Sequence, residues 1–498
     1  MYQKYKILFL GLVTAGVMLQ YSCKKYINAG PIDQTYDANF WTNQNSVEEA
    51  VAGAYVNLRT AIENGANYFV FGDLTSDEIT TTAWNLATVI PGSNKDYNYV
   101  PYYEHSLKNW SDFYVTINQC NLILARATQM PLSDFGGDST VRNSYLGEAY
   151  FIRAFSYFYM VRAWSDPVVY NQLLTNPSSV PLLKRSPDST VLRLCIGDVQ
   201  SAINYLSWTT PDNAGPVRAG KGAALALLAH IYAWQKDYTD AAAACDQIIQ
   251  SGNYSLETAP NYLNIWAGGD PESIFELNML FTQNVSETSG SFFGKFLEPP
   301  YVNTNARSSA YYTVNNDQDF YDLYGGYNTT NDADTALDIR FQQCFGMSNN
   351  NNLLLLKYNN VKYTNPAQPS QGFYCNNNLV IFRLADIILL DAEANAYLGN
   401  SAKAISLVNQ IRERANVPDY DPSDGDLYKF VIDERARELF GEGWHYYDLI
   451  RSGFLSQEIP QISPSRIAQQ GYAWPLDLSS LKPADPLLNQ TTWWAIHP

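Results

Sequence analysis

Two adjacent acidic residues, Asp77 and Glu78, are the first place where the sequence could carry acid–base chemistry. Glycoside hydrolysis needs two carboxyl groups held on either side of a sugar, roughly 5 to 9.5 Å apart. Neighbouring residues in a loop usually point in different directions, and no second acidic motif offers a partner for either carboxyl group. The sequence therefore does not favour a hydrolase.

A second chemical candidate is the segment 215–222, which reads Gly-Pro-Val-Arg-Ala-Gly-Lys-Gly and comes within one residue of a phosphate-binding P-loop. A P-loop needs Ser or Thr after the lysine to hold magnesium, and it must follow a buried strand. Because Gly222 has no hydroxyl group, we expect an ordinary helix entry here. The four histidines do not have the spacing of metal ligands. We therefore predict no enzymatic activity, no metal and no cofactor.

Aromatic side chains are a stronger signal than these catalytic candidates. The chain contains 37 Tyr, 22 Phe and 11 Trp, and only 16% of its residues are charged. A neutral sugar presents apolar CH faces and a rim of hydroxyl groups, so flat rings beside amides or Arg suit it. Two regions, 77–103 and 266–327, combine such side chains. The ligand-binding residues that we predict from them are Trp84, Asn85, Tyr97, Arg307, Tyr311 and Tyr312. The alternative, that these rings pack the protein itself or touch a protein partner, stays open.

The charge balance limits the partners. Lys and Arg number 32 against 49 Asp and Glu, which gives a formal net charge of -17. Phosphate backbones and anionic lipid surfaces are poor partners for such a chain, so we expect no nucleic-acid binding. The six cysteines have no Cys-x-x-Cys spacing, which predicts buried thiols rather than a disulfide framework or a zinc knuckle.

The elements that would position the aromatic regions are mostly helices. Apolar residues recur with helical spacing from Ser46, which we expect to cap the first helix, and again over 106–129, 139–165 and 188–206. The helical spacing of apolar residues is absent over 72–103, which predicts a long loop there. Loops of that length are usually functional or disordered.

Two further segments, 218–250 and 383–415, read as helix, short turn, helix, with small alanines where the helices must approach. They resemble tetratricopeptide repeats. Between them, 251–378 is rich in Asn, Gly, Tyr and Ser and has only short strand-like runs, and one more helix is predicted over 428–450. We predict a mainly α fold, a tetratricopeptide-like helical-repeat scaffold (an alpha-alpha superhelix) with an inserted loop-rich lobe that contains short β hairpins.

The N-terminus predicts export. Two lysines within residues 1–6 precede the apolar run 7–19, which is too short to span a bilayer stably. The Leu-Gln-Tyr-Ser-Cys box that follows predicts lipidation of Cys23. Ordinary signal cleavage, which would leave a soluble periplasmic protein with a spare thiol, is the alternative. The predicted organisation is a lipoprotein signal peptide over 1–22, an N-terminal region over 23–250 with a binding loop over 72–103, and a C-terminal region over 251–498 with the loop-rich lobe 251–378 and helices within 383–451.

Three motifs in order give the chain a family resemblance. They lie at 147–168, with Gly-Glu-Ala, Arg-Ala-Phe and Asp-Pro-Val, at 383–412, with Arg-Leu-Ala-Asp and Asn-Gln-Ile-Arg, and at 433–451, with Asp-Glu-Arg-Ala-Arg-Glu-Leu and Gly-Glu-Gly. With them the sequence resembles the SusD/RagB family of outer-membrane nutrient-binding lipoproteins from Bacteroidota. The tail over 485–491 keeps only the outline of the family's Asn-Pro-x-Leu-x-Gln-Asn ending.

The resemblance implies a cell-surface lipoprotein, anchored in the outer membrane by its lipid, that captures an oligosaccharide. It also implies a partner, a SusC-like TonB-dependent outer-membrane barrel over which the lipoprotein sits as a lid. The alternatives are a peptide-capturing member of the same family and a structural lid without substrate contact. Among the motif residues, we expect ion pairs that fix helix register rather than a ligand role for Arg153, Glu393, Arg435 and Glu438.

Overall fold

The fold is mainly helical. The computed structural model describes residues 40–64, 67–82, 97, 105–173, 181–210, 214–280, 292–324 and 338–497. Its long helices are α4 (Gln44–Glu63), α7 (Ser111–Gln129), α8 (Ser139–Trp164), α9 (Asp188–Tyr205), α10 (Lys221–Trp234), α11 (Tyr238–Gln250), α14 (Leu384–Tyr397), α15 (Ser401–Ala415), α16 (Leu427–Glu438) and α17 (His445–Ser452). The short ones are α5 (Asn67–Phe69), α12 (Gln318–Leu323), α13 (Ile339–Cys344), α18 (Leu455–Glu458), α19 (Pro464–Ala468), α20 (Leu478–Leu481) and α21 (Thr492–Ile496).

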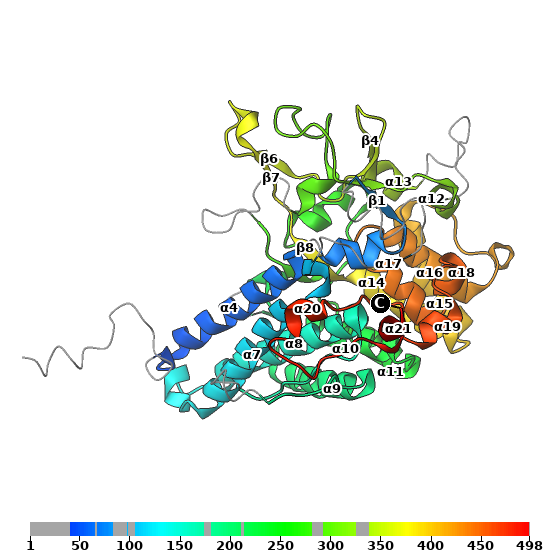
Figure 1. Cartoon of the computed structure of the whole chain (residues 1–498). Coiled ribbons are helices and arrows are strands. Elements are labelled where there is room, and N and C mark those ends of the chain that lie inside the picture. The colour runs from blue at the N-terminus through cyan, green and yellow to red at the C-terminus, as the bar shows by residue number, and fades with distance from the viewer. Residues whose placement is uncertain are drawn as a thin grey trace, which may run out of the picture.

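The long helices stack in sequence order, each against the next. Helix α4 packs on α7 and α8, and the series continues from α8 through α9, α10 and α11 to α14 and α15 (Figure 1). The two predicted repeat hairpins are confirmed as α10–α11 and α14–α15. They pack directly on each other through α11 and α14, although residues 251–383 separate them in the chain. The scaffold is therefore one continuous helical stack from which the intervening segment is looped out.

Helix α8 forms the centre of this stack. Its residues are buried almost without interruption from Tyr145 to Trp164, because α4, α7 and α9 pack around it. The aromatic side chains of Phe151, Phe155 and Tyr159 are no more than 1% exposed. The helix thus supplies aromatic core rather than ligand contacts.

Buried ion pairs lock the helices together, as the sequence predicted. The Arg153 guanidinium on α8 donates to both carboxylate oxygens of Asp198 on α9, at 2.8 and 2.7 Å. Arg435 donates to Asp386 and Asp448 at 2.9 Å each. The other two predicted residues, Glu393 and Glu438, accept from Arg451 at 2.6 Å and from Arg383 at 2.6 Å respectively. The expected structural role of the four motif residues is confirmed.

Three details of the predicted helices are wrong. The N-cap of α4 is Asn43, whose side chain accepts from the Ser46 N–H, so Ser46 lies inside the helix. The helix expected over 428–450 is two helices, α16 and α17, because Gly441 and Gly443 between them have positive φ values of 71° and 77° that only glycine adopts readily. The tail from residue 459 onward is interrupted by prolines, which predicts coil, but it contains α19, α20 and α21.

The lobe above the stack is built from two-stranded antiparallel pairs. They are β1 (Ile79–Thr81) with β3 (Tyr312–Val314), β2 (Ser273–Leu277) with β8 (Leu379–Arg383), β4 (Phe345–Met347) with β5 (Leu353–Leu355), and β6 (Val361–Tyr363) with β7 (Phe373–Cys375). Most of these strands lie in 251–378, as predicted for a loop-rich lobe with short hairpins. Strand β8 continues directly into α14, so the pair β2–β8 ties the lobe to the helical stack (Figure 1).

Two further expectations concern thiols and the membrane. The five described cysteines are buried free thiols, as predicted, and burial raises the pKa of Cys120 and Cys344 to about 12. In the described part of the chain, no helix is both long enough and apolar enough to cross a bilayer. Cys23 lies outside the described residues.

Candidate ligand-binding site

The pair β1–β3 brings together the two aromatic regions singled out in the sequence. In its register Ile79 faces Val314 and Thr81 faces Tyr312. Just beyond the pair, the Thr82 N–H donates to the Tyr311 carbonyl at 3.0 Å. The segment that leads into 83–96 and the segment 310–315 are therefore neighbours, although more than 200 residues separate them.

A buried carboxylate shapes the loop that precedes β3. Glu298 is fully buried and accepts hydrogen bonds from the Ala310 N–H at 2.9 Å and from the side chains of Asn350 and Asn352 at 2.9 and 2.8 Å. Burial alone would raise the pKa of Glu298, but these side-chain and backbone donors, with Ser348, hold it below the usual value. Because a fixed anion links both ends of the loop to 348–352, the loop is held in one shape.

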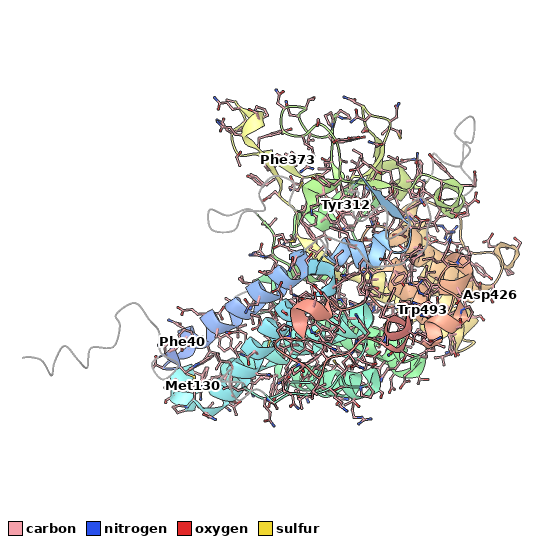
Figure 2. All side chains as sticks on the ribbon, in the orientation of Figure 1. Phe40, Met130, Tyr312, Phe373, Asp426 and Trp493 are labelled. Carbon is pink, nitrogen blue, oxygen red and sulfur yellow. The ribbon has the colours of Figure 1, made fainter. Side chains whose placement is uncertain are left out.

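This loop presents a cation between two rings. The Arg307 guanidinium carbon lies 5.7 Å from the centre of the Tyr311 ring and 5.6 Å from that of Phe373 on β7. The Tyr311 side chain is 50% exposed, whereas Phe373 is buried. Figure 2 shows Phe373 and Tyr312 together in the strand-rich lobe, far from Met130 at the end of α7. An exposed ring beside an oriented guanidinium is what stacking plus hydrogen bonding to a sugar requires.

Two of the predicted ligand residues are not accessible. Tyr312 is 3% exposed and packs on Phe296, with ring centres 5.4 Å apart. Tyr97 is 1% exposed, and its carbonyl oxygen accepts from Arg466 at 2.6 Å. Both rings are buried, so neither belongs to an exposed stacking surface in this structure.

The other four predicted ligand-binding residues form two pairs. Arg307 and Tyr311 lie together, as described above, whereas Trp84 and Asn85 lie outside the described residues. In the sequence these two follow Thr82 closely, and Thr82 is bonded to Tyr311. Phe373 is not among the predicted ligand residues, because the second aromatic region ends at 327. The adjacent aromatic residues Phe373 and Tyr374 are the sequence signal that could have found it.

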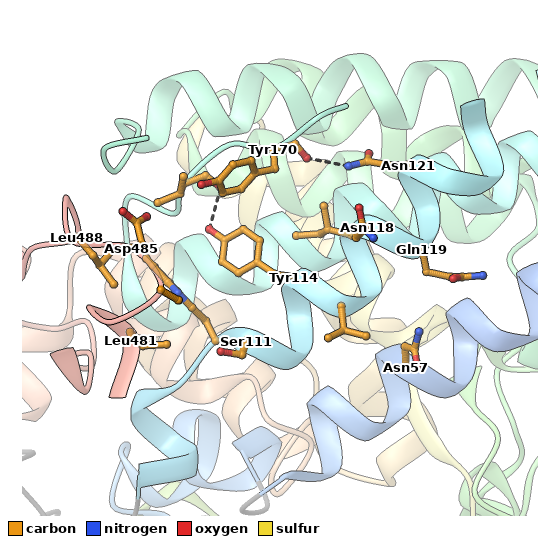
Figure 3. A pocket seen from close by; sticks show the side chains of 15 residues that line it. Asn57, Ser111, Tyr114, Asn118, Gln119, Asn121, Tyr170, Leu481, Asp485 and Leu488 are labelled. Atoms are coloured by element: carbon orange, nitrogen blue, oxygen red, sulfur yellow. Dashed lines mark hydrogen bonds between the residues drawn. The ribbon is translucent and has the colours of Figure 1, made fainter. Parts of the chain in front are cut away.

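The structure also contains a pocket that the sequence did not predict. It lies between α4, α7 and the C-terminal tail and has a volume of about 490 Å³ (Figure 3). Its walls are mainly aromatic and aliphatic, with amide, hydroxyl and carboxyl groups among them. The lining residues are Asn57, Trp110, Ser111, Tyr114, Val115, Ile117, Asn118, Gln119, Asn121, Val168, Tyr170, Leu481, Ala484, Asp485 and Leu488.

Two sequence models of protein families match the chain. Residues 346–475 match the SusD family, and residues 31–233 match a family described as starch-binding and associating with the outer membrane. SusD-like protein P38 of Formosa agariphila is 26% identical over 95% of this chain and 96% of its own length. A SusD-like protein of Bacteroides ovatus is 22% identical over 89% of this chain and 81% of its own length.

Solved structures share the whole architecture. A SusD homolog from Bacteroides thetaiotaomicron superposes with a TM-score of 0.77 at 23% identity, over 91% of this chain and 98% of the other. NanU of B. fragilis gives a TM-score of 0.71 at 21% identity, over 93% and 99%. At these identities the likeness concerns the fold. The helical-repeat scaffold and the lobe are thus a shared arrangement.

Proposed function

Because the chain belongs to the SusD/RagB family, we propose that it is a cell-surface lipoprotein, anchored through Cys23, which binds an oligosaccharide without catalysis and delivers it to a SusC-like TonB-dependent barrel. Family membership supports glycan binding and association with the outer membrane. The choice of an oligosaccharide as ligand, its delivery to the barrel and the lipid anchor at Cys23 go beyond family membership and form the proposal.

One observation carries the location of the binding site. The hydrogen-bonded pair β1–β3 holds exposed Tyr311, with Arg307 beside it, next to the segment that continues into Trp84 and Asn85. Rings and amides from two distant segments would then face one ligand. The sugar would stack on Tyr311 and Trp84, while Arg307 and Asn85 would bond its hydroxyl groups.

The negative charge of the chain is compatible with a neutral glycan. An anionic polysaccharide would meet a formal net charge of -17. Because stacking on an aromatic face and hydrogen bonding to hydroxyl groups need no charge on the ligand, an uncharged oligosaccharide meets no such repulsion. This supports an uncharged oligosaccharide as the cargo.

Calorimetry with the mature chain and a panel of neutral oligosaccharides tests the proposal. On a glycan that binds, we expect Tyr311→Ala and Trp84→Ala each to weaken the affinity about tenfold or more, equivalent to about 1.4 kcal/mol. The matched control is Tyr397→Ala, since Tyr397 is 55% exposed but lies at the end of α14, outside the lobe. Unchanged affinity in both site variants would remove this surface from the binding site.

Binding experiments of the same kind distinguish the two alternatives, a peptide-capturing protein and a structural lid without substrate contact. Retention of peptides and of no glycan would favour a peptide-capturing protein. Co-purification with the barrel together with no retention of either ligand class would favour a structural lid. Mass spectrometry of the mature N-terminus checks the anchor, since an unmodified Cys23 would contradict it.

A further inference from the structure

The pocket between α4, α7 and the tail has rigid aromatic walls. Trp110, Tyr114 and Tyr170 pack edge to face in series, with ring centres 5.7 and 5.9 Å apart and both interplanar angles 82°. Both tyrosine hydroxyls are anchored, since Tyr114 donates to the Val168 carbonyl at 2.7 Å and Tyr170 to the Pro181 carbonyl at 2.9 Å. The rings are therefore held in place before any ligand arrives.

Polar groups from three elements reach the same pocket, as Figure 3 shows for Asn57 on α4, Ser111 on α7 and Asp485 on the tail. Within the described segments, the Asn57 carboxamide and the Ser111 hydroxyl make no hydrogen bond with protein. Among the residues that the structure describes, the Asp485 carboxylate accepts only from the Leu487 N–H, at 3.2 Å. These groups offer donors and acceptors beside a wall of aromatic and aliphatic side chains.

The charge of the lining selects against anions. Asp485 is its one charged residue, and neither Lys, Arg nor His is among the lining side chains. The volume of about 490 Å³ falls within the range of small-molecule pockets, roughly 300 to 1,000 Å³. Apolar rings with a few convergent polar groups suit an uncharged ring that has one apolar face and several hydroxyl groups.

We propose that this pocket is a second ligand site, which binds one or two rings of a neutral sugar. The sugar contacts the rings of Tyr114 and Tyr170, and its hydroxyl groups bond Asn57, Ser111 and Asp485. The site is formed by α4, α7, the segment after α8 that carries Val168 and Tyr170, and the tail, whereas the surface at β1 and β3 belongs to the lobe. The proposal therefore does not depend on the one made for Tyr311 and Arg307.

The position of Trp110 in the lining allows a site-specific test. The mature chain is labelled with fluorotryptophan, and the fluorine resonance of Trp110 is assigned with the variant Trp110→Phe. The labelled protein is then titrated with maltose, cellobiose, lactose and their monosaccharides at millimolar concentration. We expect at least one of these sugars to shift the Trp110 resonance in a saturable way.

Two test variants and two control variants decide whether the shift of the Trp110 resonance reports ligand binding in this pocket. Ala484→Trp fills the pocket from an exposed position of the tail and should abolish the shift, whereas Ala402→Trp, at an exposed position of α15, should leave it unchanged. Asn57→Leu removes a polar group without a protein partner and should weaken binding about tenfold. Tyr311→Ala should have no effect on the Trp110 titration.

Two results would overturn the proposal. One is a Trp110 resonance that none of the sugars moves. The other is a shift that persists in Ala484→Trp at the wild-type affinity, because the sugar would then bind elsewhere. Thermal unfolding of each variant shows whether it is folded, and both tryptophan variants place the new ring at exposed positions.

Discussion

Gly72 and Gly443 lie backbone against backbone. A Cβ atom on Gly72 would come within 2.3 Å of the carbonyl carbon of Gly443. The Asp73 carboxylate, next in the chain, accepts from the Gly443 N–H at 2.9 and 3.0 Å. This contact fixes the segment that leads into β1 against the turn between α16 and α17, and so connects the proposed ligand surface to the third family motif.

The absence of a side chain at position 72 should therefore matter. We expect Gly72→Ala to lower the free energy of unfolding by about 1–3 kcal/mol, because two backbones must separate to admit one methyl group. Gly197→Ala is the matched control, since Gly197 lies within α9 with nothing within 4 Å of its Cβ position, and alanine there should stabilise by up to about 1 kcal/mol. Chemical denaturation measures both. Equal effects would contradict the close contact.

The hydrogen bond from Thr82 to Tyr311 should control ligand affinity. Thr82→Pro removes the N–H that donates to the Tyr311 carbonyl at 3.0 Å, a loss of about 1 kcal/mol. We expect weaker glycan binding by calorimetry and faster amide hydrogen exchange in 310–314. Thr82→Ala keeps the N–H and should bind like the wild type. Identical affinities in the two variants would show that this bond does not position Tyr311.

The buried ion pair Arg153–Asp198 should contribute far more to the free energy of unfolding than an exposed ion pair does. Asp198→Asn leaves the buried Arg153 guanidinium without its carboxylate, which typically lowers the free energy of unfolding by about 3–5 kcal/mol. Glu63→Gln breaks the pair between Arg59 and Glu63, which are 3.9 Å apart and partly exposed, and should cost no more than about 1 kcal/mol. Urea denaturation of both variants gives the comparison. A small loss in Asp198→Asn would mean that water replaces the carboxylate.

Glu78 should make stability depend on pH. Burial raises the pKa of the Glu78 carboxyl well above 4.5, and the nearby Asp73 carboxylate adds to the rise. The native state then holds this proton more tightly than the unfolded state, so its contribution to stability falls as the pH rises from about 4.5 through the native pKa. Because glutamine does not ionise, Glu78→Gln removes this loss of stability at high pH.

We therefore expect Glu78→Gln to melt about 1–2 °C above the wild type at neutral pH and to lose that advantage near pH 4. The exposed Glu413→Gln is the matched control. Differential scanning calorimetry across this pH range measures the difference. An advantage that grows toward acid pH would show that the native carboxyl is stabilised in its charged form.

Much of the fold was present in local sequence patterns. The helical period of 218–250 and 383–415 predicts the hairpins α10–α11 and α14–α15, because amphipathic spacing depends only on residues a few places apart. The motif residues Arg153, Glu393, Arg435 and Glu438 form the expected buried ion pairs. Helix ends were less predictable, as the break at Gly441 and Gly443 shows, since the neighbouring helical pattern continues across it.

The composition alone predicted the chemical character of the ligand-binding surface, which is uncharged and carries flat aromatic rings and amide groups. Which rings face outward was decided by tertiary structure. Tyr311 and Tyr312 are identical in type and adjacent in sequence, yet Tyr311, just outside β3, is 50% exposed, whereas Tyr312, paired with Thr81 of β1, is buried. Strand register depends on partners more than 200 residues away, and no local pattern contains it. The pocket beside Trp110 likewise exists only because the tail folds back onto α7.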